Sequence, residues 1–221
     1  IQAQAIPVAM EGRDMIGQAQ TGTGKTAAFG IPLLQKVDPK VKKLQAIILL
    51  PTRELAIQVA EEMRRLAKFM HGTKVLPIYG GQDIVKQIRS LKDGTQIVVG
   101  TPGRVMDHMR RKTVKFDHVS MAVLDEADEM LNMGFTDSIN AILADVPQER
   151  NTLLFSATMS PEIARISKKY LHNAKEITIG RRNEGTSNVK HVVFTVHAKD
   201  KYAALKRIVD YYPQIYGIIF C

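Results

Sequence analysis

Residues 15–26 read Met15-Ile16-Gly17-Gln18-Ala19-Gln20-Thr21-Gly22-Thr23-Gly24-Lys25-Thr26. The segment Met15–Ala19 suits a buried strand, and a glycine-rich loop ending in Lys25 and Thr26 follows it. Such a loop between a strand and a helix curls backbone N–H groups round a phosphate, and the helix adds its positive end. The strict pattern begins with Gly where this chain has Ala19. The stretch still predicts a phosphate-binding loop rather than a turn that only caps a helix.

Apolar segments with strand character alternate with amphipathic segments along most of the chain. The expected strands are Met15–Ala19, Ala46–Leu50, Lys74–Tyr79, Gln96–Gly100, Val119–Asp125, Asn151–Phe155 and Glu176–Ile179. The expected helices are Thr26–Gln35, Glu54–Phe69, Ile84–Leu91, Arg104–Arg110, Thr136–Ala144 and Ser160–Tyr170. Several strands are almost wholly apolar, as strands buried on both faces must be. The alternation therefore predicts an α/β fold with a parallel β-sheet flanked by helices and joined by right-handed crossovers.

A polar segment at residues 181–188 interrupts this alternation and is typical of an interdomain linker. After it we expect a strand at Val189–Val196, a helix at Lys199–Tyr211 and a strand at Ile215–Cys221. One βαβ unit is too small to close a core alone. We therefore expect a domain over residues 1–180 and the incomplete beginning of a second one over 189–221, poorly packed, docked on the first or swapped. Both chain ends resemble the inside of elements, so we expect a piece of a longer protein.

Charge and composition narrow the class of partner. The 221 residues carry 31 Lys and Arg against 22 Asp and Glu, a net charge of +9, which makes a polyanionic partner plausible. The single cysteine, Cys221, excludes an internal disulfide framework and fits a reducing compartment. The six histidines lack metal-ligand spacing. No apolar run approaches the roughly 18 residues of a membrane span, so we expect no membrane partner.

An acidic cluster, Asp125-Glu126-Ala127-Asp128, follows the most apolar strand. A carboxylate at the end of a buried strand beside a phosphate loop commonly contributes to Mg²⁺ binding. We expect Asp125 and the Thr26 hydroxyl to serve Mg²⁺, and Lys25 to reach the β- and γ-phosphates. Glu126 suits a general base that polarises the attacking water, and Asp128 suits a residue that orients its neighbours. The alternative is an acidic helix start favoured by the helix dipole.

The acidic cluster and Ala19–Thr26 together resemble the motifs of the DEAD-box RNA helicases. The residues of these motifs look like those of bacterial members of the family. Further motifs of that family follow in order: Pro51-Thr52-Arg53-Glu54-Leu55-Ala56, Gly80-Gly81, Thr101-Pro102-Gly103-Arg104, Ser156-Ala157-Thr158 and Ile219-Phe220-Cys221. The start, Ile1–Pro7, is similar to the end of the family's Gln-containing adenine motif. Each motif is weak alone, but eight in the right order are very specific, and the resemblance covers essentially the whole chain.

The resemblance implies a RecA-like P-loop domain followed by a truncated βαβ start of a second RecA-like domain. It also implies an ATP-dependent RNA helicase that uses ATP and Mg²⁺ and is cytoplasmic, with Lys25, Asp125 and Glu126 as catalytic residues. The implied ATP-binding residues are Gln2, which reads adenine, with Gln20, Thr21, Gly22, Thr23, Gly24, Lys25 and Thr26. The implied RNA-binding residues are Pro51, Thr52, Arg53, Gly80, Gly81, Thr101, Pro102, Gly103 and Arg104. The implied links between the ATP and RNA sites are Asp128, Ser156 and Thr158.

The residues alone leave plainer interpretations open for these motifs. Thr52, Thr101 and Ser156 could simply begin helices, and Gly80-Gly81 could be an ordinary tight turn.

Ligands of open parallel sheets bind at the carboxyl ends of the strands, so all these loops are expected on the same edge as the phosphate loop. Trp is absent and aromatic residues make up 6%, which favours a grip on the nucleic-acid backbone over base stacking.

Two rival functions remain at the level of sequence. One is a DNA translocase or helicase with the same motor, because the residues do not separate RNA from DNA. The other is a nonenzymatic clamp that holds RNA when ATP is bound, although intact Lys25, Asp125 and Glu126 argue against a dead enzyme. The family's aromatic residue upstream of Gln2 and its arginine-finger segment are absent from the 221 residues. We therefore expect this chain alone to bind nucleotide weakly, hydrolyse little and not unwind.

Overall fold

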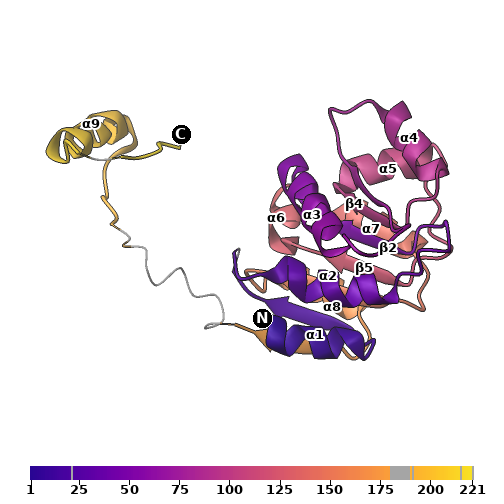
Figure 1. Ribbon diagram of the computed structural model, residues 1–221. Helices are drawn as coiled ribbons and strands as arrows, with labels where there is room; N and C mark the ends of the chain where they lie inside the picture. Colours follow the sequence, from indigo (N-terminus) through magenta and orange to yellow (C-terminus); the bar gives the residue numbers. More distant parts are fainter. Residues whose placement is uncertain (21, 180–189, 191, 215, 221) are drawn as a thin grey trace. The chain divides into compact units, whose positions relative to one another are not determined.

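The computed structural model describes residues 1–20, 22–179, 190, 192–214 and 216–220. The chain divides into two compact units, Ile1–Glu184 and Gly185–Cys221, and each is described by itself (Figure 1). The expected linker at residues 181–188 lies outside the described residues.

The first unit is built on a parallel sheet. Its strands are β1 (Met15–Gln18), β2 (Ala46–Leu49), β3 (Val75–Ile78), β4 (Ile97–Gly100), β5 (Met121–Leu124), β6 (Asn151–Ser156) and β7 (Lys175–Thr178). They lie in the order β3-β4-β2-β5-β6-β1-β7, and every pairing is parallel. The predicted parallel sheet and its expected strands are confirmed, with ends that differ by at most two residues. Because all strands run the same way, the loops that follow them meet at one edge.

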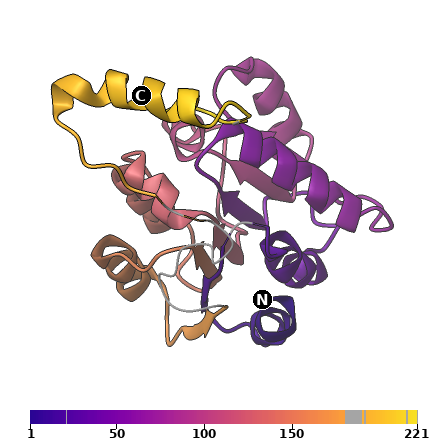
Figure 2. The same cartoon turned by 90° about the vertical axis from the view of Figure 1, so that its left-hand side faces the viewer.

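Helices cover both faces of this sheet. The helices α1 (Gln2–Met10), α2 (Lys25–Lys36) and α3 (Arg53–Leu66) pack on one face. The other face is covered by α4 (Ile84–Lys92), α5 (Pro102–Arg110), α6 (Ala127–Asn132), α7 (Thr136–Asp145) and α8 (Pro161–Tyr170). Figure 2 shows the indigo and violet helices of the early chain on one side of the strands and the later pink to orange-brown ones on the other. Among the described residues, no helix is long and apolar enough to cross a membrane.

The two layers explain why the central strands are apolar throughout. In β2, Ile48 packs with Phe29 and Met63 under the first layer, and its neighbour Ile47 packs under the second layer with Ile142. Successive side chains of a strand point to opposite faces, so a sheet covered on both faces leaves β2 no position for a polar residue.

The predicted helices are all present. The α1 helix is an additional one, and α6 begins at the acidic cluster, where a helix start had been the alternative interpretation. The α1 helix carries Pro7 in its interior, which weakens its local helical signal. It is held by packing instead, since Ala5 and Ala9 are fully buried against the first core. The α3 helix ends at Leu66 rather than at Phe69, whose side chain is exposed.

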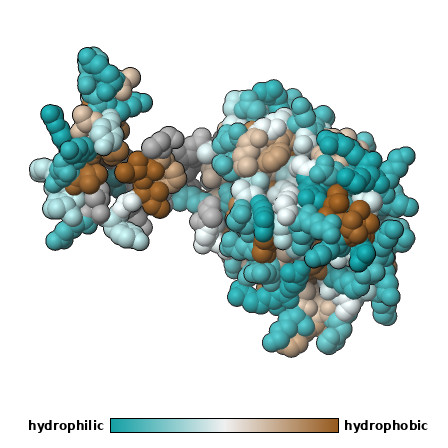
Figure 3. Space-filling model, turned by 90° about the horizontal axis from the view of Figure 1, so that it is seen from above, coloured by the Kyte–Doolittle hydropathy of each residue, from teal (hydrophilic) through white to brown (hydrophobic). Residues whose placement is uncertain are grey.

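The second unit corrects part of the prediction for residues 189–221. The expected helix is present as η1 (Ala198–Asp200) and α9 (Lys201–Tyr211). The expected strands Val189–Val196 and Ile215–Cys221 are not found in their described parts, residues 190, 192–196 and 216–220. A strand needs partners for its backbone groups, and isolated segments of this length do not supply them. Apolar residues such as Val193 and Phe220 stay exposed, and Figure 3 shows brown apolar patches among the teal surface of this unit.

Asp14 secures the amino ends of three strands. It lies just before β1, is buried, and its carboxylate accepts hydrogen bonds from the backbone N–H of Thr152 (2.7 Å) and of His172 (2.6 Å). The Asn151 side-chain amide adds a third bond at 3.3 Å. These contacts tie β1 to β6 and to the segment that leads into β7.

We predict that Asp14→Ala lowers the free energy of unfolding by about 3 kcal/mol, because it leaves at least one buried N–H without an acceptor. Urea unfolding followed by circular dichroism measures this. Asp117→Ala, at an exposed carboxylate, is the matched control and should stay within about 0.5 kcal/mol of the unsubstituted chain. Equal midpoints for the two variants contradict the role given to Asp14.

Candidate functional site

The glycine-rich loop after β1 is shaped by a contact with α1. Gly24 is the residue before α2 and has φ +83°, a backbone conformation that favours glycine. The side-chain amide of Gln2 donates to the Gly24 carbonyl at 3.2 Å and occupies the space a Cβ would need. Within the loop, the Thr23 hydroxyl donates to the Gln20 carbonyl at 2.8 Å.

The other expected loop residues lie around this contact. Gly22 is exposed with φ +83°, and Thr26 is half-buried in the first turn of α2. Thr21 lies outside the described residues. The structure thus places Gln2 beside the loop, as the sequence led us to expect. Gln2 belongs to α1, a helix that the sequence did not predict.

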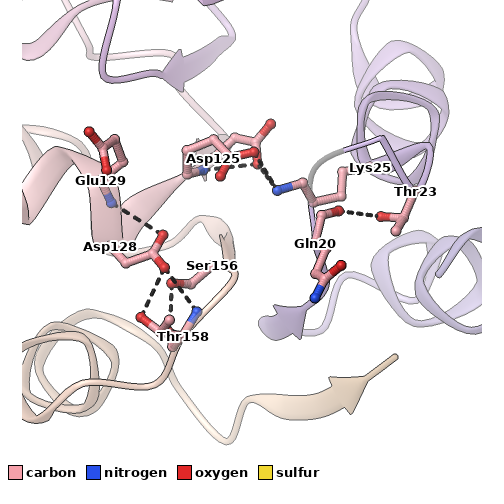
Figure 4. Close-up of polar contacts among 9 residues, drawn as sticks. Gln20, Thr23, Lys25, Asp125, Asp128, Glu129, Ser156 and Thr158 are labelled. Carbon is pink, nitrogen blue, oxygen red and sulfur yellow. Dashed lines mark hydrogen bonds and ion pairs between the residues drawn. The ribbon is translucent and has the colours of Figure 1, made fainter. Parts of the chain in front are cut away.

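Lys25 joins the loop to the acidic cluster after β5. Its ammonium Nζ lies 2.7 Å from Glu126 Oε1 and 3.4 Å from Asp125 Oδ1, and the Lys25 side chain is only 5% exposed (Figure 4). The structure therefore brings these three residues together, as predicted, although Lys25 is far from the other two in the sequence. A buried ammonium needs such partners, because its charge is costly away from water.

Asp125 and Glu126 share the single ammonium group of Lys25. Burial raises the pKa of Asp125 above its ordinary value, with Glu126 adding to the rise and Lys25 opposing it. Asp125 therefore holds its proton more tightly than an exposed carboxyl group does.

Glu126 departs from ordinary backbone geometry. It has φ +52° and ψ +48°, the left-handed conformation, which costs a non-glycine residue about 1–2 kcal/mol. Its backbone N–H donates to Asp125 Oδ1 at 2.9 Å. Strain of this kind is concentrated at functional sites, where surrounding contacts impose it.

The donor set beside the triad fits Mg²⁺. Mg²⁺ is usually held by one or two carboxylates with substrate phosphates and water, and a Thr hydroxyl with one Asp fits that chemistry. In the part of the chain that the structure describes, no three His, Cys, Asp or Glu side chains converge as a metal cluster. A cation at Asp125 and Thr26 would therefore draw its remaining ligands from nucleotide and water.

Asp128 ties the acidic cluster to the loop after β6. Its Oδ2 accepts from the backbone N–H and from the hydroxyl of Thr158, both at 2.9 Å (Figure 4). The buried Ser156 hydroxyl donates to the Thr158 carbonyl at 2.7 Å, and Gln18 in β1 donates to the Ala157 carbonyl at 3.1 Å. The loop at 156–158 is thus held from α6, β6 and β1 at once.

The expected nucleic-acid loops follow β2, β3 and β4 on the same edge. Arg53 is exposed, and its guanidinium lies 5.1 Å from the centre of the Tyr79 ring and against Gly81. Gly80 and Gly81 are exposed, and Gly81 has φ +82°.

Several of the remaining residues shape these loops. The Thr52 hydroxyl caps α3 by accepting from the Leu55 N–H at 3.3 Å, and the Thr101 N–H donates to the Ile78 carbonyl at 2.9 Å. Pro51 and Pro102 are buried, and Gly103 is half-buried.

Arg104 is arranged differently from Arg53. Its side chain is only 12% exposed, with Nε 4.0 Å from Asp107 Oδ2. Its Nη2 donates to the Gln82 carbonyl at 3.0 Å, so it holds the loop that contains Gly80 and Gly81. Sequence reasoning gave Arg104 a phosphate contact and did not anticipate this internal one.

Two buried polar residues beneath this loop were missed by sequence reasoning. Gln87 is 1% exposed and His108 is fully buried, and they are hydrogen-bonded to each other at 3.0 Å. The signal that could have found them is a polar residue on the otherwise apolar face of a helix: Gln87 lies between Ile84 and Leu91, and His108 follows Val105 at helical spacing.

The fold and the loop geometry define a P-loop protein of the RecA-like class. A family model described as DEAD/DEAH box helicase matches residues 1–166, and the chain belongs to that family. The expected resemblance is confirmed.

Curated relatives agree with this assignment. The chain is 53% identical over 220 residues to the ATP-dependent RNA helicase CshA of Listeria monocytogenes, covering 100% of this chain and 42% of that protein. It is 49% identical over 220 residues to the DEAD-box ATP-dependent RNA helicase CshA of Bacillus subtilis, covering 100% and 44%. The chain thus spans less than half the length of these relatives.

Solved structures confirm the fold. A DEAD box protein from the hyperthermophile Methanococcus jannaschii aligns with a TM-score of 0.75 and 40% identity, over 99% of this chain and 58% of that one. A hypothetical ATP-dependent RNA helicase from Sulfolobus tokodaii aligns with a TM-score of 0.73 and 37% identity, over 80% and 51%.

We predict that Asp125→Asn raises the free energy of unfolding of the nucleotide-free chain at pH 7.5 by about 1 kcal/mol. A gain of this size is common when a substitution removes an unfavourable group from a functional site. Burial raises the pKa of Asp125, so the native state binds its proton more tightly than the unfolded state and stability falls as pH rises through the raised pKa. The substitution removes this cost and leaves Lys25 paired with Glu126.

Lys25→Met is the matched variant and should lower stability, because it leaves the buried Asp125 and the half-buried Glu126 without a cation. Urea unfolding without nucleotide or divalent cation measures both. A loss of stability in Asp125→Asn comparable to that of Lys25→Met overturns the account of the triad.

Proposed function

We propose that this chain is the ATP-binding part of an ATP-dependent RNA helicase, which couples RNA-stimulated ATP hydrolysis to local unwinding of RNA duplexes or remodelling of ribonucleoproteins. The observation that carries the proposal is the contact of Lys25 with Glu126 and Asp125 at the loop edge of a parallel sheet. The choice of RNA rests on relatives at about half identity that are named ATP-dependent RNA helicases.

ATP is bound by the loop after β1 and by Gln2. Gln2 reads the adenine edge, and Gln20, Thr21, Gly22, Thr23 and Gly24 surround the phosphates with Lys25 and Thr26. Lys25 exchanges its contact with Glu126 for oxygens of the β- and γ-phosphates, because both partners compete for one ammonium. Glu126 is then released to polarise the attacking water and accept its proton.

Thr26 and Asp125 hold Mg²⁺ when it is bound. The ion supplies charge neutralisation on the phosphates, as in other P-loop enzymes.

RNA is held by the loops that follow β2, β3 and β4, at the same edge of the sheet as the ATP site but on its other half. Arg53 offers an exposed charge, and Gly80 and Gly81 allow close approach of a sugar-phosphate backbone. The other contributors are Pro51, Thr52, Thr101, Pro102, Gly103 and Arg104. A net charge of +9 supports a backbone grip with little sequence preference and strong salt dependence.

Asp128, Ser156 and Thr158 couple the two halves. Their hydrogen bonds join the acidic cluster to the loop after β6, so a shift of the cluster on ATP binding moves that loop. The domain limits at 1–180, 181–188 and 189–221 and the cytoplasmic location stay predictions.

In the full-length protein that carries this chain, we predict RNA-stimulated ATP hydrolysis that Glu126→Gln reduces by about 10²-fold or more, the usual worth of a general base. Steady-state phosphate release is measured with single-stranded RNA, with DNA of matched sequence and with neither. ATP affinity of Glu126→Gln serves as the control and should not fall, because the substitution removes a competitor for the Lys25 ammonium.

The other outcomes each point to a rival. Equal or greater stimulation by DNA favours a DNA translocase. RNA held tightly in the presence of ATP with negligible turnover favours a nonenzymatic clamp. Unchanged turnover in Glu126→Gln removes that residue from the role of base.

We further predict that the 221-residue chain alone binds ATP weakly, hydrolyses little and does not unwind. An arginine finger is typically worth 10³–10⁵-fold in rate, and the family places it in a segment that these residues do not include. The same assay tests this, and robust RNA-stimulated turnover by the 221 residues refutes it.

A further inference from the structure

The loop at residues 79–82 is where three of the proposed RNA-contacting segments meet. Arg53 lies over the Tyr79 ring at 5.1 Å and against Gly81. Arg104 donates to the Gln82 carbonyl at 3.0 Å. The relative position of the two arginines and the glycine pair therefore depends on how this loop is held.

Gln87 in α4 holds the loop from beneath. Its side-chain Nε2 donates to the Tyr79 carbonyl at 3.1 Å and to Gln82 Oε1 at 2.7 Å. A carbonyl can only accept, so the bond to Tyr79 fixes which end of the Gln87 amide faces the loop. Gln87 Oε1 must then face the other way, toward His108 Nε2 at 3.0 Å.

His108 in α5 completes the chain of hydrogen bonds. Because Gln87 offers it an acceptor, His108 Nε2 carries the proton. Nδ1 is then an acceptor 2.8 Å from the Thr113 hydroxyl, whose single proton is shared between Nδ1 and the His108 carbonyl at 3.1 Å. Burial lowers the pKa of His108, with Arg104 and Arg111 lowering it further and Asp107 opposing them, so the ring is neutral at physiological pH.

These bonds close into a ring between two helices and the loop. Arg104 and His108 lie four residues apart on α5, on the same side of the helix. One reaches the Gln82 carbonyl directly, and the other reaches the Gln82 side chain through Gln87. Since Gln87 and His108 are almost wholly buried, breaking one bond leaves polar groups that water does not reach.

We propose that Gln87, fixed by His108, is a positioning residue that sets the geometry of the loop at 79–82 relative to Arg53 and Arg104, and through it the affinity for a single-stranded RNA backbone. This inference rests on the proposed function. Gln87 itself is buried and touches no ligand.

The test compares Gln87→Leu with Val85→Ala in the full-length protein, with a non-hydrolysable ATP analogue present. Leucine keeps the volume of Gln87 and removes its hydrogen bonds, and Val85 is a half-exposed uncharged neighbour on α4, outside the ring of bonds. We expect Gln87→Leu to raise the Kd for a labelled single-stranded RNA about tenfold, with the Kd for the ATP analogue within about twofold. We expect Val85→Ala to change neither.

Two further readouts do not depend on RNA binding. Amide hydrogen exchange over residues 79–83 should be faster in Gln87→Leu than in Val85→Ala. Nitrogen chemical shifts of His108 should report the Nε2–H tautomer, and Gln87→Glu, which keeps the acceptor but removes the donors, should move the ring toward the protonated form while still loosening the loop.

The outcomes separate the two proposals. If the unsubstituted protein binds RNA and Gln87→Leu binds it equally well, Gln87 has no positioning role and the inference is overturned. Equal loss of affinity for RNA and for the ATP analogue also overturns it, because that indicates general unfolding. If the unsubstituted protein binds no RNA, the proposed function fails and the RNA part of this inference fails with it, while exchange over 79–83 still decides whether Gln87 fixes the loop.

Discussion

All paired strands of the first unit run parallel, and the candidate chemistry depends on that constraint. Parallel pairing brings the loops after the strands to one edge, although they are far apart in the sequence. Lys25 meets Glu126 across 101 positions, and Asp128 meets Thr158 across 30. The price of the arrangement is a sheet covered on both faces, which requires strands as apolar as β2 and β5.

The site departs from the local rules that the rest of the fold obeys. Lys25 and Asp125 are ionisable residues with 5% exposure, and Glu126 has a left-handed backbone. Each of these features lowers the stability of the fold, and surrounding contacts compensate for it. The Lys25 ammonium lies between two carboxyl groups, and the Glu126 N–H donates to Asp125 Oδ1. Such concentrations of cost mark sites that are kept for binding or chemistry rather than for folding.

The sequence predicted the strands and the two motifs that form the triad, because each of them is encoded by residue types at short spacing. Apolar runs identify strands, and Gly24-Lys25 after a strand identifies a phosphate loop. The support beneath the loop at 79–82 could not be predicted, since Gln87 and His108 are single polar residues whose partners depend on how α4 packs beside α5. The prediction of strands in the second unit was wrong for a different reason. The residues around Phe194 and Ile219 favour a strand locally, but a strand also needs a neighbouring strand to pair with.

The two halves of the edge use charge in opposite ways. On the proposed ATP side, Lys25 is neutralised by carboxylates, so a phosphate must displace an existing ion pair. On the proposed RNA side, the groups beneath the loop, Gln87 and His108, are neutral, and Arg53 keeps its charge exposed for phosphates. A carboxylate in place of Gln87 would compensate the nearby Arg104 and weaken the positive field on that half. Neutral support of the loop therefore adds no negative charge near Arg53, which stays available to a polyanion, while Lys25 keeps its ion pairs until nucleotide arrives.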